Sequence, residues 1–273
     1  MDPFRTRDHV PRFDEIVRDY ARRSADTRSR RQAVLNVSFG PSPGDRLDLF
    51  LPAGTGAPAP LHVFVHGGYW RMFGKEDFSF IADTVVEAGA IAAVLDYDLM
   101  PRVRLASIVE QVRRAVRWLS AEIGRFGGDP QALSVSGHSA GAHLCCWLLD
   151  PEASGVRVRS ALLLSGVYDL APLQHSFLRD LIALTDEEVA SWSPLRQRLR
   201  TEAAVAVIVG ERETAPFHDH AARLVGHLAA EHGDIRQLTL PDEDHMTAVL
   251  ALGDARSPAG QALRRVIEAS RSG

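Results

Sequence analysis

Short runs of β-branched and other apolar residues alternate along the chain with longer stretches in which apolar residues recur at helical spacing. The short runs predict eight strands, at residues 33–39, 47–51, 62–65, 91–96, 132–135, 161–164, 205–209 and 236–240. The helical patterns lie at residues 77–88, 107–123, 140–149, 215–231 and 259–269. This alternation predicts an α/β fold with a mainly parallel eight-stranded sheet and helices on both faces. The first two strands, joined by a Gly/Pro-rich turn, are expected to form a hairpin.

Two segments fall outside this alternation. Residues 1–31 alternate in charge without a clean apolar stripe, so we expect an N-terminal arm with one helix. Residues 32–273 are then expected to form a single domain. Within it, residues 171–200 join two strands without a single period, and a connection that long usually serves as a lid or a pocket wall.

The composition of the 273-residue chain is that of an ordinary globular protein, with 45% apolar and 24% charged residues. The net charge of -4 argues against nucleic acid as a partner. No run of apolar residues and glycine exceeds eight, which is too short for a membrane span, and no apolar leader precedes the arm. We therefore expect a cytoplasmic protein whose partner is a small-molecule substrate. The sequence leaves open whether the protein forms a homodimer.

Metal and cofactor chemistry has little support in the sequence. The two cysteines, Cys145 and Cys146, are adjacent within an apolar stretch and cannot form a disulfide framework or a cysteine-based zinc site. His218 and His220 resemble a metal-binding pair, but no carboxylate completes a ligand set at a recognisable spacing. The prediction is a protein with no metal and no cofactor.

Residues 137–141 read G-H-S-A-G, directly after a predicted strand and directly before a predicted helix. This is the context of a nucleophile elbow, in which Gly137 and Gly141 relieve crowding in a sharp turn and Ser139 projects its hydroxyl at the carboxyl edge of the sheet. The next residue, Ala140, offers its backbone N–H at a helix N-terminus, where a developing oxyanion is stabilised. Ser139 is therefore the candidate nucleophile.

A second motif, H-G-G-Y-W at residues 66–70, follows the third predicted strand. Its glycine pair lets the backbone turn and present N–H groups toward the elbow, so Gly68 and Tyr69 are the other candidate oxyanion donors. His66 and His138, which lie inside the two motifs, are expected to brace the loops rather than to act as the base.

The general base is expected after the last strand, where His245 stands. The carboxylate that orients it should follow the preceding strand of the sheet, and Glu213 occupies the usual position there. Asp169 is the main competitor, with Glu211 and Asp244 behind it. Along the chain the nucleophile comes first, then the acid and then the base, which is the order expected when the nucleophile stands on an elbow of this kind.

On these motifs the sequence resembles the kynurenine formamidase (arylformamidase) branch of the α/β-hydrolases. The segments that carry the resemblance are residues 66–70, 96–101, 137–144 and 165–170. The resemblance implies an α/β-hydrolase fold and a serine hydrolase that converts N-formyl-L-kynurenine to L-kynurenine and formate. It also implies Ser139 as nucleophile, His245 as base and residues 66–70 as the oxyanion loop. The chain departs from the family pattern at Glu213, where Asp is typical, and at Met246, where Phe is usual.

Four aromatic residues are candidate walls for an aromatic substrate: Tyr69, Trp70, Tyr168 and Trp192. Each could equally belong to the core. The predicted activity is hydrolysis of N-formyl aryl amides through a covalent intermediate, and the alternative is a short-chain carboxylesterase.

Overall fold

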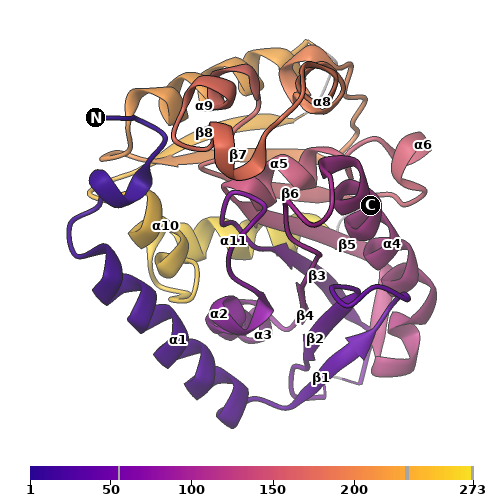
Figure 1. Cartoon of the computed structure of the whole chain (residues 1–273). Helices are drawn as coiled ribbons and strands as arrows, with labels where there is room; N and C mark the ends of the chain where they lie inside the picture. The colour runs from indigo at the N-terminus through magenta and orange to yellow at the C-terminus, as the bar shows by residue number, and fades with distance from the viewer. Residues whose placement is uncertain (55, 231–233, 272–273) are drawn as a thin grey trace.

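The computed structural model describes residues 1–54, 56–230 and 234–271, and it contains all eight predicted strands in one sheet (Figure 1). The strands are β1 (Ala33–Ser38), β2 (Arg46–Phe50), β3 (Ala59–Val65), β4 (Ile91–Leu95), β5 (Gly128–His138), β6 (Ser160–Leu164), β7 (Ala204–Gly210) and β8 (Ile235–Leu240). Their spatial order is β1-β2-β4-β3-β5-β6-β7-β8. The predicted hairpin is confirmed as antiparallel β1 and β2, β2 also pairs antiparallel with β4, and all other pairs are parallel.

Helices cover both faces of the sheet, as predicted (Figure 1). The longer helices are α1 (Phe13–Arg30), α4 (Leu105–Glu122), α9 (Ala215–Ala229) and α11 (Pro258–Ala269), and the shorter ones near the sheet are α2 (Lys75–Phe78), α3 (Ala82–Glu87), α5 (Ala140–Cys146) and α10 (His245–Ala251). One apolar core lies between the sheet and α4, α5 and α9, and the other lies between the sheet and α1, α3, α10 and α11. Alternation along β3 feeds both cores, because Val63 and Val65 enter the first and Phe64 the second.

The helix predicted over residues 77–88 is broken in the structure. A 3-10 turn, η2 (Ser79–Ile81), separates α2 from α3. The Ser79 hydroxyl donates to the Lys75 carbonyl at 3.1 Å, a local bond that competes with the helical ladder and bends the chain. The helix predicted to end at residue 231 ends at Ala229, and residue 231 lies outside the described residues. Helix α10 was not among the predicted helices.

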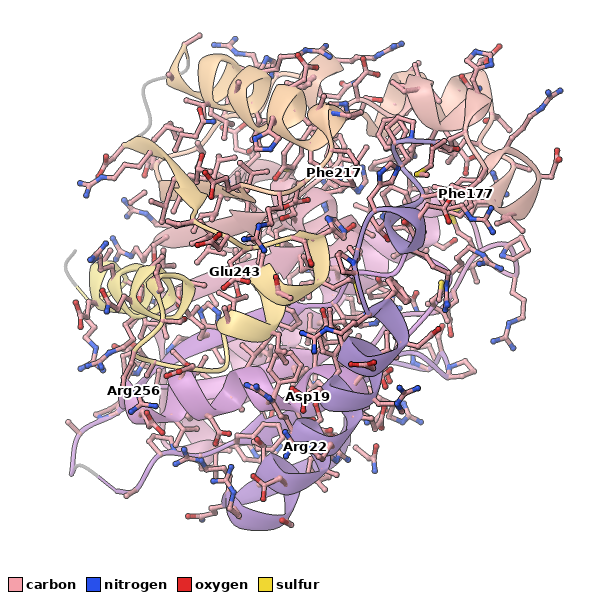
Figure 2. All side chains as sticks on the ribbon, turned by 90° about the vertical axis from the view of Figure 1, so that its left-hand side faces the viewer. Asp19, Arg22, Phe177, Phe217, Glu243 and Arg256 are labelled. Carbon is pink, nitrogen blue, oxygen red and sulfur yellow. The ribbon has the colours of Figure 1, made fainter. Side chains whose placement is uncertain are left out.

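The N-terminal arm has the expected single helix, α1, preceded by one 3-10 turn, η1 (Thr6–Asp8). It is not detached from the domain. The Tyr20 hydroxyl donates to the Met246 carbonyl at 2.5 Å, and Phe4 packs edge-on against Phe217 with ring centroids 6.2 Å apart. Figure 2 shows the first residues of the chain running beside Phe177 and Phe217, so the arm covers the carboxyl edge of the sheet.

The long connection at residues 171–200 consists of short helical pieces: α7 (Arg179–Ile182), α8 (Asp186–Trp192) and the 3-10 turns η4 (Ala171–His175) and η5 (Pro194–Arg196). A further short helix, α6 (Pro151–Ser154), precedes β6. Arg104, at the start of α4, ties the connection down through the Glu188 carboxylate and the Ala183 carbonyl. Among the described helices, none has the length and apolar character needed to cross a membrane.

Candidate active site

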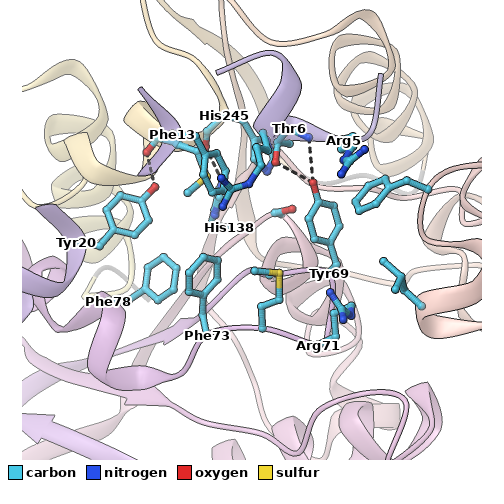
Figure 3. Close-up of a pocket in the computed structure, with 17 residues that line it drawn as sticks. Arg5, Thr6, Phe13, Tyr20, Tyr69, Arg71, Phe73, Phe78, His138 and His245 are labelled. Atoms are coloured by element: carbon cyan, nitrogen blue, oxygen red, sulfur yellow. Dashed lines mark hydrogen bonds between the residues drawn. The ribbon is translucent and has the colours of Figure 1, made fainter. Parts of the chain in front are cut away.

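A cavity of about 240 Å³ opens at the carboxyl edge of the sheet and contains the three motifs found in the sequence (Figure 3). Ser139 of the elbow, Gly68 and Tyr69 of the glycine loop, and His245 all line it. The parallel strands β3 and β5 end there, and α10 begins there after β8. Segments that are far apart in the sequence therefore meet because parallel strands end at the same edge.

Ser139 has the strained backbone of a nucleophile elbow, with φ 54° and ψ -116°. Its amide donates to the Leu164 carbonyl of β6 at 2.8 Å, which fixes the turn against the sheet. A Cβ at Gly137 would lie 2.3 Å from the Gly141 carbonyl oxygen, and one at Gly141 would lie 1.9 Å from that of Val65. Only glycine fits at these two positions, and the strain is held by the packing around the elbow.

His245 is the first residue of α10, and its neighbours fix its backbone. The Asp244 carboxylate caps the helix by accepting from the amides of Met246 and Thr247, both at 2.9 Å. His138 Nε2 donates to the His245 carbonyl at 2.9 Å, and the two imidazole centroids are 4.6 Å apart. Burial lowers the pKa of His138 well below its ordinary value. His138 is therefore a neutral brace, the part expected of it.

Glu213 lies directly behind His245. Its Oε2 accepts from His245 Nδ1 at 2.6 Å, and its Oε1 accepts from the Gly210 amide at 2.8 Å and from the Ser165 hydroxyl. The carboxylate is fully buried and the imidazole is nearly so. Because Nδ1 is held as the donor to Glu213, the unprotonated nitrogen of the neutral ring is Nε2.

The other candidate carboxylates are committed elsewhere. Asp169 forms ion pairs with Arg196 at 3.1 Å and Arg223 at 3.5 Å. Glu211 accepts from the backbone amide at residue 242, and Asp244 caps α10 as described above. Among the four carboxylates that the sequence left open, the structure brings only Glu213 to the imidazole.

Two residues of the glycine loop that line the cavity have free backbone amides. Within the described residues, neither the Gly68 nor the Tyr69 amide donates a hydrogen bond. Gly68 has φ 108°, and a Cβ there would meet the Met72 carbonyl oxygen at 2.3 Å. Ala140, as the first residue of α5, has an N–H with no carbonyl one helical turn earlier to bind. Of the three residues expected as oxyanion donors, Gly68 and Tyr69 thus line the same cavity as Ser139, and Ala140 follows Ser139 directly at the elbow.

His66, the first residue of this loop, is a buried brace. Its ring stacks on Tyr97 with centroids 4.2 Å apart and an interplanar angle of 10°, and its Nδ1 bonds to the Gly67 carbonyl at 2.7 Å. The Tyr97 hydroxyl in turn donates to the His66 carbonyl at 2.9 Å. The ring is therefore held away from the role of a base.

Tyr69 is held in the cavity wall by the N-terminal arm (Figure 3). Its hydroxyl lies 2.8 Å from the Thr6 hydroxyl and donates to the Phe4 carbonyl, also at 2.8 Å. Its ring meets Phe177 edge-on, with centroids 5.2 Å apart. Tyr69 and Trp70 have φ of 53° and 58°, so the loop carries two consecutive left-handed residues. Such strain concentrates at functional sites.

The other three aromatic residues expected to wall the substrate do not line the cavity. Trp70 is buried, with its ring edge-on to His143 at 5.0 Å, and Tyr168 is buried beside His220. Trp192 packs against Trp147 at 5.1 Å. These bulky rings fill the core beneath the loop and the connection, where they bury more apolar surface than they could in an open cavity.

Most of the side chains that line the cavity were not predicted from the sequence pattern. The arm contributes Arg5, Thr6, Phe13 and Tyr20 to the cavity, and the segments near the glycine loop and the long connection contribute Arg71, Met72, Phe73, Phe78, Phe177 and Leu181. The arm residues had one detectable signal, because Phe13 and Tyr20 are apolar positions in an otherwise charged segment.

Of the histidine pair on α9, His218 and His220, the second has a structural role. His220 is buried, and its Nδ1 accepts from the Tyr168 amide at 2.9 Å. Burial lowers the pKa of His220 to about 4, so it is neutral near pH 7. In the described part of the chain, no three His, Cys, Asp or Glu side chains gather closely enough to hold a metal ion.

Comparison with known proteins finds relatives that are named as hydrolases. A family model described as BD-FAE matches residues 47–149. Kynurenine formamidase of Salmo salar is 28% identical over 260 residues, which cover 90% of this chain and 87% of the relative.

Solved structures agree with the fold. A crystal structure from Silicibacter sp., of a protein provisionally named a thioesterase, is 30% identical, covers 97% of both chains and has a TM-score of 0.85. A hyperthermophilic esterase from Pyrobaculum calidifontis is 18% identical and has a TM-score of 0.75, covering 95% of this chain and 92% of its own. At that identity the archaeal enzyme supports the fold alone.

Proposed function

Since the chain belongs to the kynurenine formamidase-like branch of the α/β-hydrolase superfamily and is a hydrolase, we propose that it cleaves N-formyl aryl amides, with N-formyl-L-kynurenine as the principal substrate. The observation that carries the proposal is the buried Glu213–His245 pair in the cavity that Ser139 lines. The roles given below to these residues are part of the proposal.

The first half of the reaction forms a formyl-enzyme. Ser139 Oγ attacks the formyl carbon while His245 Nε2 takes the hydroxyl proton. The negative charge that develops on the carbonyl oxygen is stabilised by the backbone N–H groups of Gly68, Tyr69 and Ala140. The imidazolium then gives its proton to the aniline nitrogen as the C–N bond breaks, and the arylamine leaves.

The second half repeats the cycle with water. His245 Nε2 takes a proton from a water molecule, the hydroxide oxygen attacks the formyl ester, and the ester bond to Ser139 breaks. The imidazolium returns its proton to Ser139 Oγ, and formate is released. Throughout, Glu213 stabilises the charged imidazolium and keeps the ring oriented.

A small acyl group is favoured by the position of Tyr69. In general esterases of the neighbouring branch, a third glycine is usual at this point of the loop. Here the ring of Tyr69 lines the cavity and is fixed by Thr6, Phe4 and Phe177. A fixed ring beside the oxyanion donors leaves less room for an acyl chain than glycine does. We expect formyl to be preferred. Each added methylene should raise the activation free energy that sets kcat/KM by about 1 to 3 kcal/mol.

The test compares kcat/KM for N-formyl-L-kynurenine, p-nitrophenyl acetate and p-nitrophenyl butyrate on one preparation. We expect turnover of the formamide and a fall from acetate to butyrate. If butyrate is the fastest substrate and the formamide is untouched, the enzyme is the short-chain carboxylesterase. Addition of a metal chelator is expected to leave the rate unchanged, and recovery of a lost rate by zinc would contradict the serine mechanism.

The Silicibacter protein's provisional name adds an acetyl thioester to that panel, with p-nitrophenyl formate as its comparison. An acetyl thioester should be hydrolysed more slowly than p-nitrophenyl formate if the acyl group decides the rate. A thioester that exceeds all oxygen esters and the formamide would favour a thioesterase.

A further inference from the structure

The charges that line the catalytic cavity all have the same sign. Three arginines, Arg5, Arg7 and Arg71, contribute to the wall, and no Asp or Glu does so among the described residues. The whole chain carries a net charge of -4, so this local excess of positive charge is not a reflection of composition. A cavity lined by one sign of charge attracts a ligand of the opposite sign.

Two of the three arginines already have partners. Arg7 forms an ion pair with Asp14 at 2.8 Å and lies over the Phe13 ring, 4.5 Å from its centroid. Arg5 lies 3.8 Å from Asp8 and over the Phe177 ring, and about half of its side chain is exposed. Both belong to the rim of the cavity, where solvent weakens their pull on a ligand.

Arg71 differs from both. It stands two residues after Tyr69, and its backbone amide donates to the Gly68 carbonyl at 2.9 Å, so the turn of the oxyanion loop fixes its position. Its side chain makes no ion pair or hydrogen bond within the described residues, and its Nε is buried without a partner. Because Arg71 also lines the cavity, its unpaired positive charge is left for a ligand that enters there.

The rest of the wall indicates what else a ligand of Arg71 would contain. Six aromatic residues line the same cavity: Phe13, Tyr20, Tyr69, Phe73, Phe78 and Phe177. Figure 3 places Arg5 and Arg71 at the Tyr69 end and Tyr20 and Phe78 at the opposite end. A ligand that satisfies both features has an aromatic body and an anionic group. A planar carboxylate fits a guanidinium best, because two parallel N–H···O bonds can form.

We propose that Arg71 is a specificity-determining residue that binds a carboxylate of the substrate, so that the enzyme selects aryl substrates that carry an anionic group over neutral ones. The inference assumes the reaction given under the proposed function. Its test does not, because the test measures inhibition of ester hydrolysis. The lining of the cavity also bears on any positive charge that the substrate carries elsewhere. Because no acidic residue lines the described cavity, an ammonium group on the substrate has no ionic partner there.

The experiment measures competitive inhibition of p-nitrophenyl acetate hydrolysis by 3-benzoylpropanoate and by its neutral amide, 3-benzoylpropanamide. The parent enzyme should bind the carboxylate at least about 10-fold more tightly, the lower range for a hydrogen bond to a charged group. The ratio of the two inhibition constants should fall to near one in Arg71→Met and be partly restored in Arg71→Lys. Arg264→Met, on the exposed face of α11, is the matched control and should keep the parental ratio.

A parental ratio near one, or an unchanged ratio in Arg71→Met, would overturn the proposal. Arg71→Gln keeps a polar side chain and replaces the Met variant if the latter fails to fold, as judged by thermal unfolding. Because the readout is inhibition of ester hydrolysis, it works even if N-formylkynurenine is not a substrate. If it is one, replacing its carboxylate by a carboxamide should lower kcat/KM at least about 10-fold, and removing its α-amino group should change it less than about fivefold.

Discussion

Replacement of Glu213 by Gln tests the orientation of His245 with almost no change in volume. Both oxygens of the carboxylate are used, and a Gln amide cannot reproduce both sets of contacts. Oε1 faces the Gly210 amide at 2.8 Å, which can only donate, and Oε2 faces His245 Nδ1 at 2.6 Å. The Gln carbonyl oxygen is therefore expected to face Gly210, which leaves the NH₂ group facing the imidazole.

With an amide donor in front of it, His245 Nδ1 has to accept. The ring proton then moves to Nε2, which faces the cavity, and the base can no longer take the proton of Ser139. The loss of the imidazolium's buried counter-charge adds to this effect. In the chymotrypsin-type triad, which is the reference case for this substitution, the rate falls about 10⁴-fold. We expect a loss in kcat of the same order, about 5 kcal/mol in the barrier.

The assay is steady-state hydrolysis of p-nitrophenyl acetate, with thermal unfolding as the control for folding. Asp169→Asn is the matched comparison, because Asp169 follows β6 and, within the described residues, pairs only with two partly exposed arginines and a local amide. It should cost less than about fivefold. A Glu213→Gln enzyme within tenfold of the parent, or an Asp169→Asn enzyme that loses as much activity as Glu213→Gln, would refute the assignment.

Three further outcomes follow from the same structure. Ser139→Ala should abolish labelling by a fluorophosphonate probe and lower the rate at least about 10⁴-fold, and a variant that still labels would exclude Ser139 as the nucleophile. Tyr69→Phe removes the hydroxyl that holds Thr6 and the Phe4 carbonyl, so limited proteolysis should cut the first residues faster and KM should rise, whereas unchanged proteolysis would contradict an arm held by this contact. Burial lowers the pKa of His62 to about 3, below the unfolded value of about 6.5, so its stability contribution is complete above pH 6.5 and is lost as the pH falls. His62→Leu should therefore reduce the slope of the unfolding free energy against pH by about 0.7 kcal/mol per pH unit at pH 6.5 and by about 1.3 at pH 5, and an unchanged slope in chemical denaturation would contradict a neutral His62.

The sequence by itself determined the elements and the chemistry that depends on local geometry. The strands carry their signal in short runs of β-branched residues, which is why all eight were predicted within a few residues of their ends. The elbow and the glycine loop were recognisable because a sharp turn forces glycine at fixed positions relative to Ser139, whatever the rest of the chain does. The place of His245 and Glu213 followed from strand order.

The tertiary structure alone decided which residues face the substrate. Periodicity marks a residue as apolar, but Trp70 and Tyr168 are buried away from the cavity, while Phe13 and Tyr20 of the arm line it, Tyr20 as a buried member of the second core. No local pattern separates these cases, because burial depends on contacts between segments that are up to 226 residues apart, as in the bond from Tyr20 to the Met246 carbonyl.

The charge of the cavity also depends on contacts between segments that are distant in the sequence. Arg71 is one of 30 arginines in the sequence, and its place directly after the glycine loop does not show whether its charge is paired. What distinguishes it is that its side chain lines the cavity and, within the described residues, forms no ion pair. An ion pair forms between groups that the fold brings within a few ångströms, so the sequence supplies the charge and only the packed structure determines whether that charge is left for a ligand.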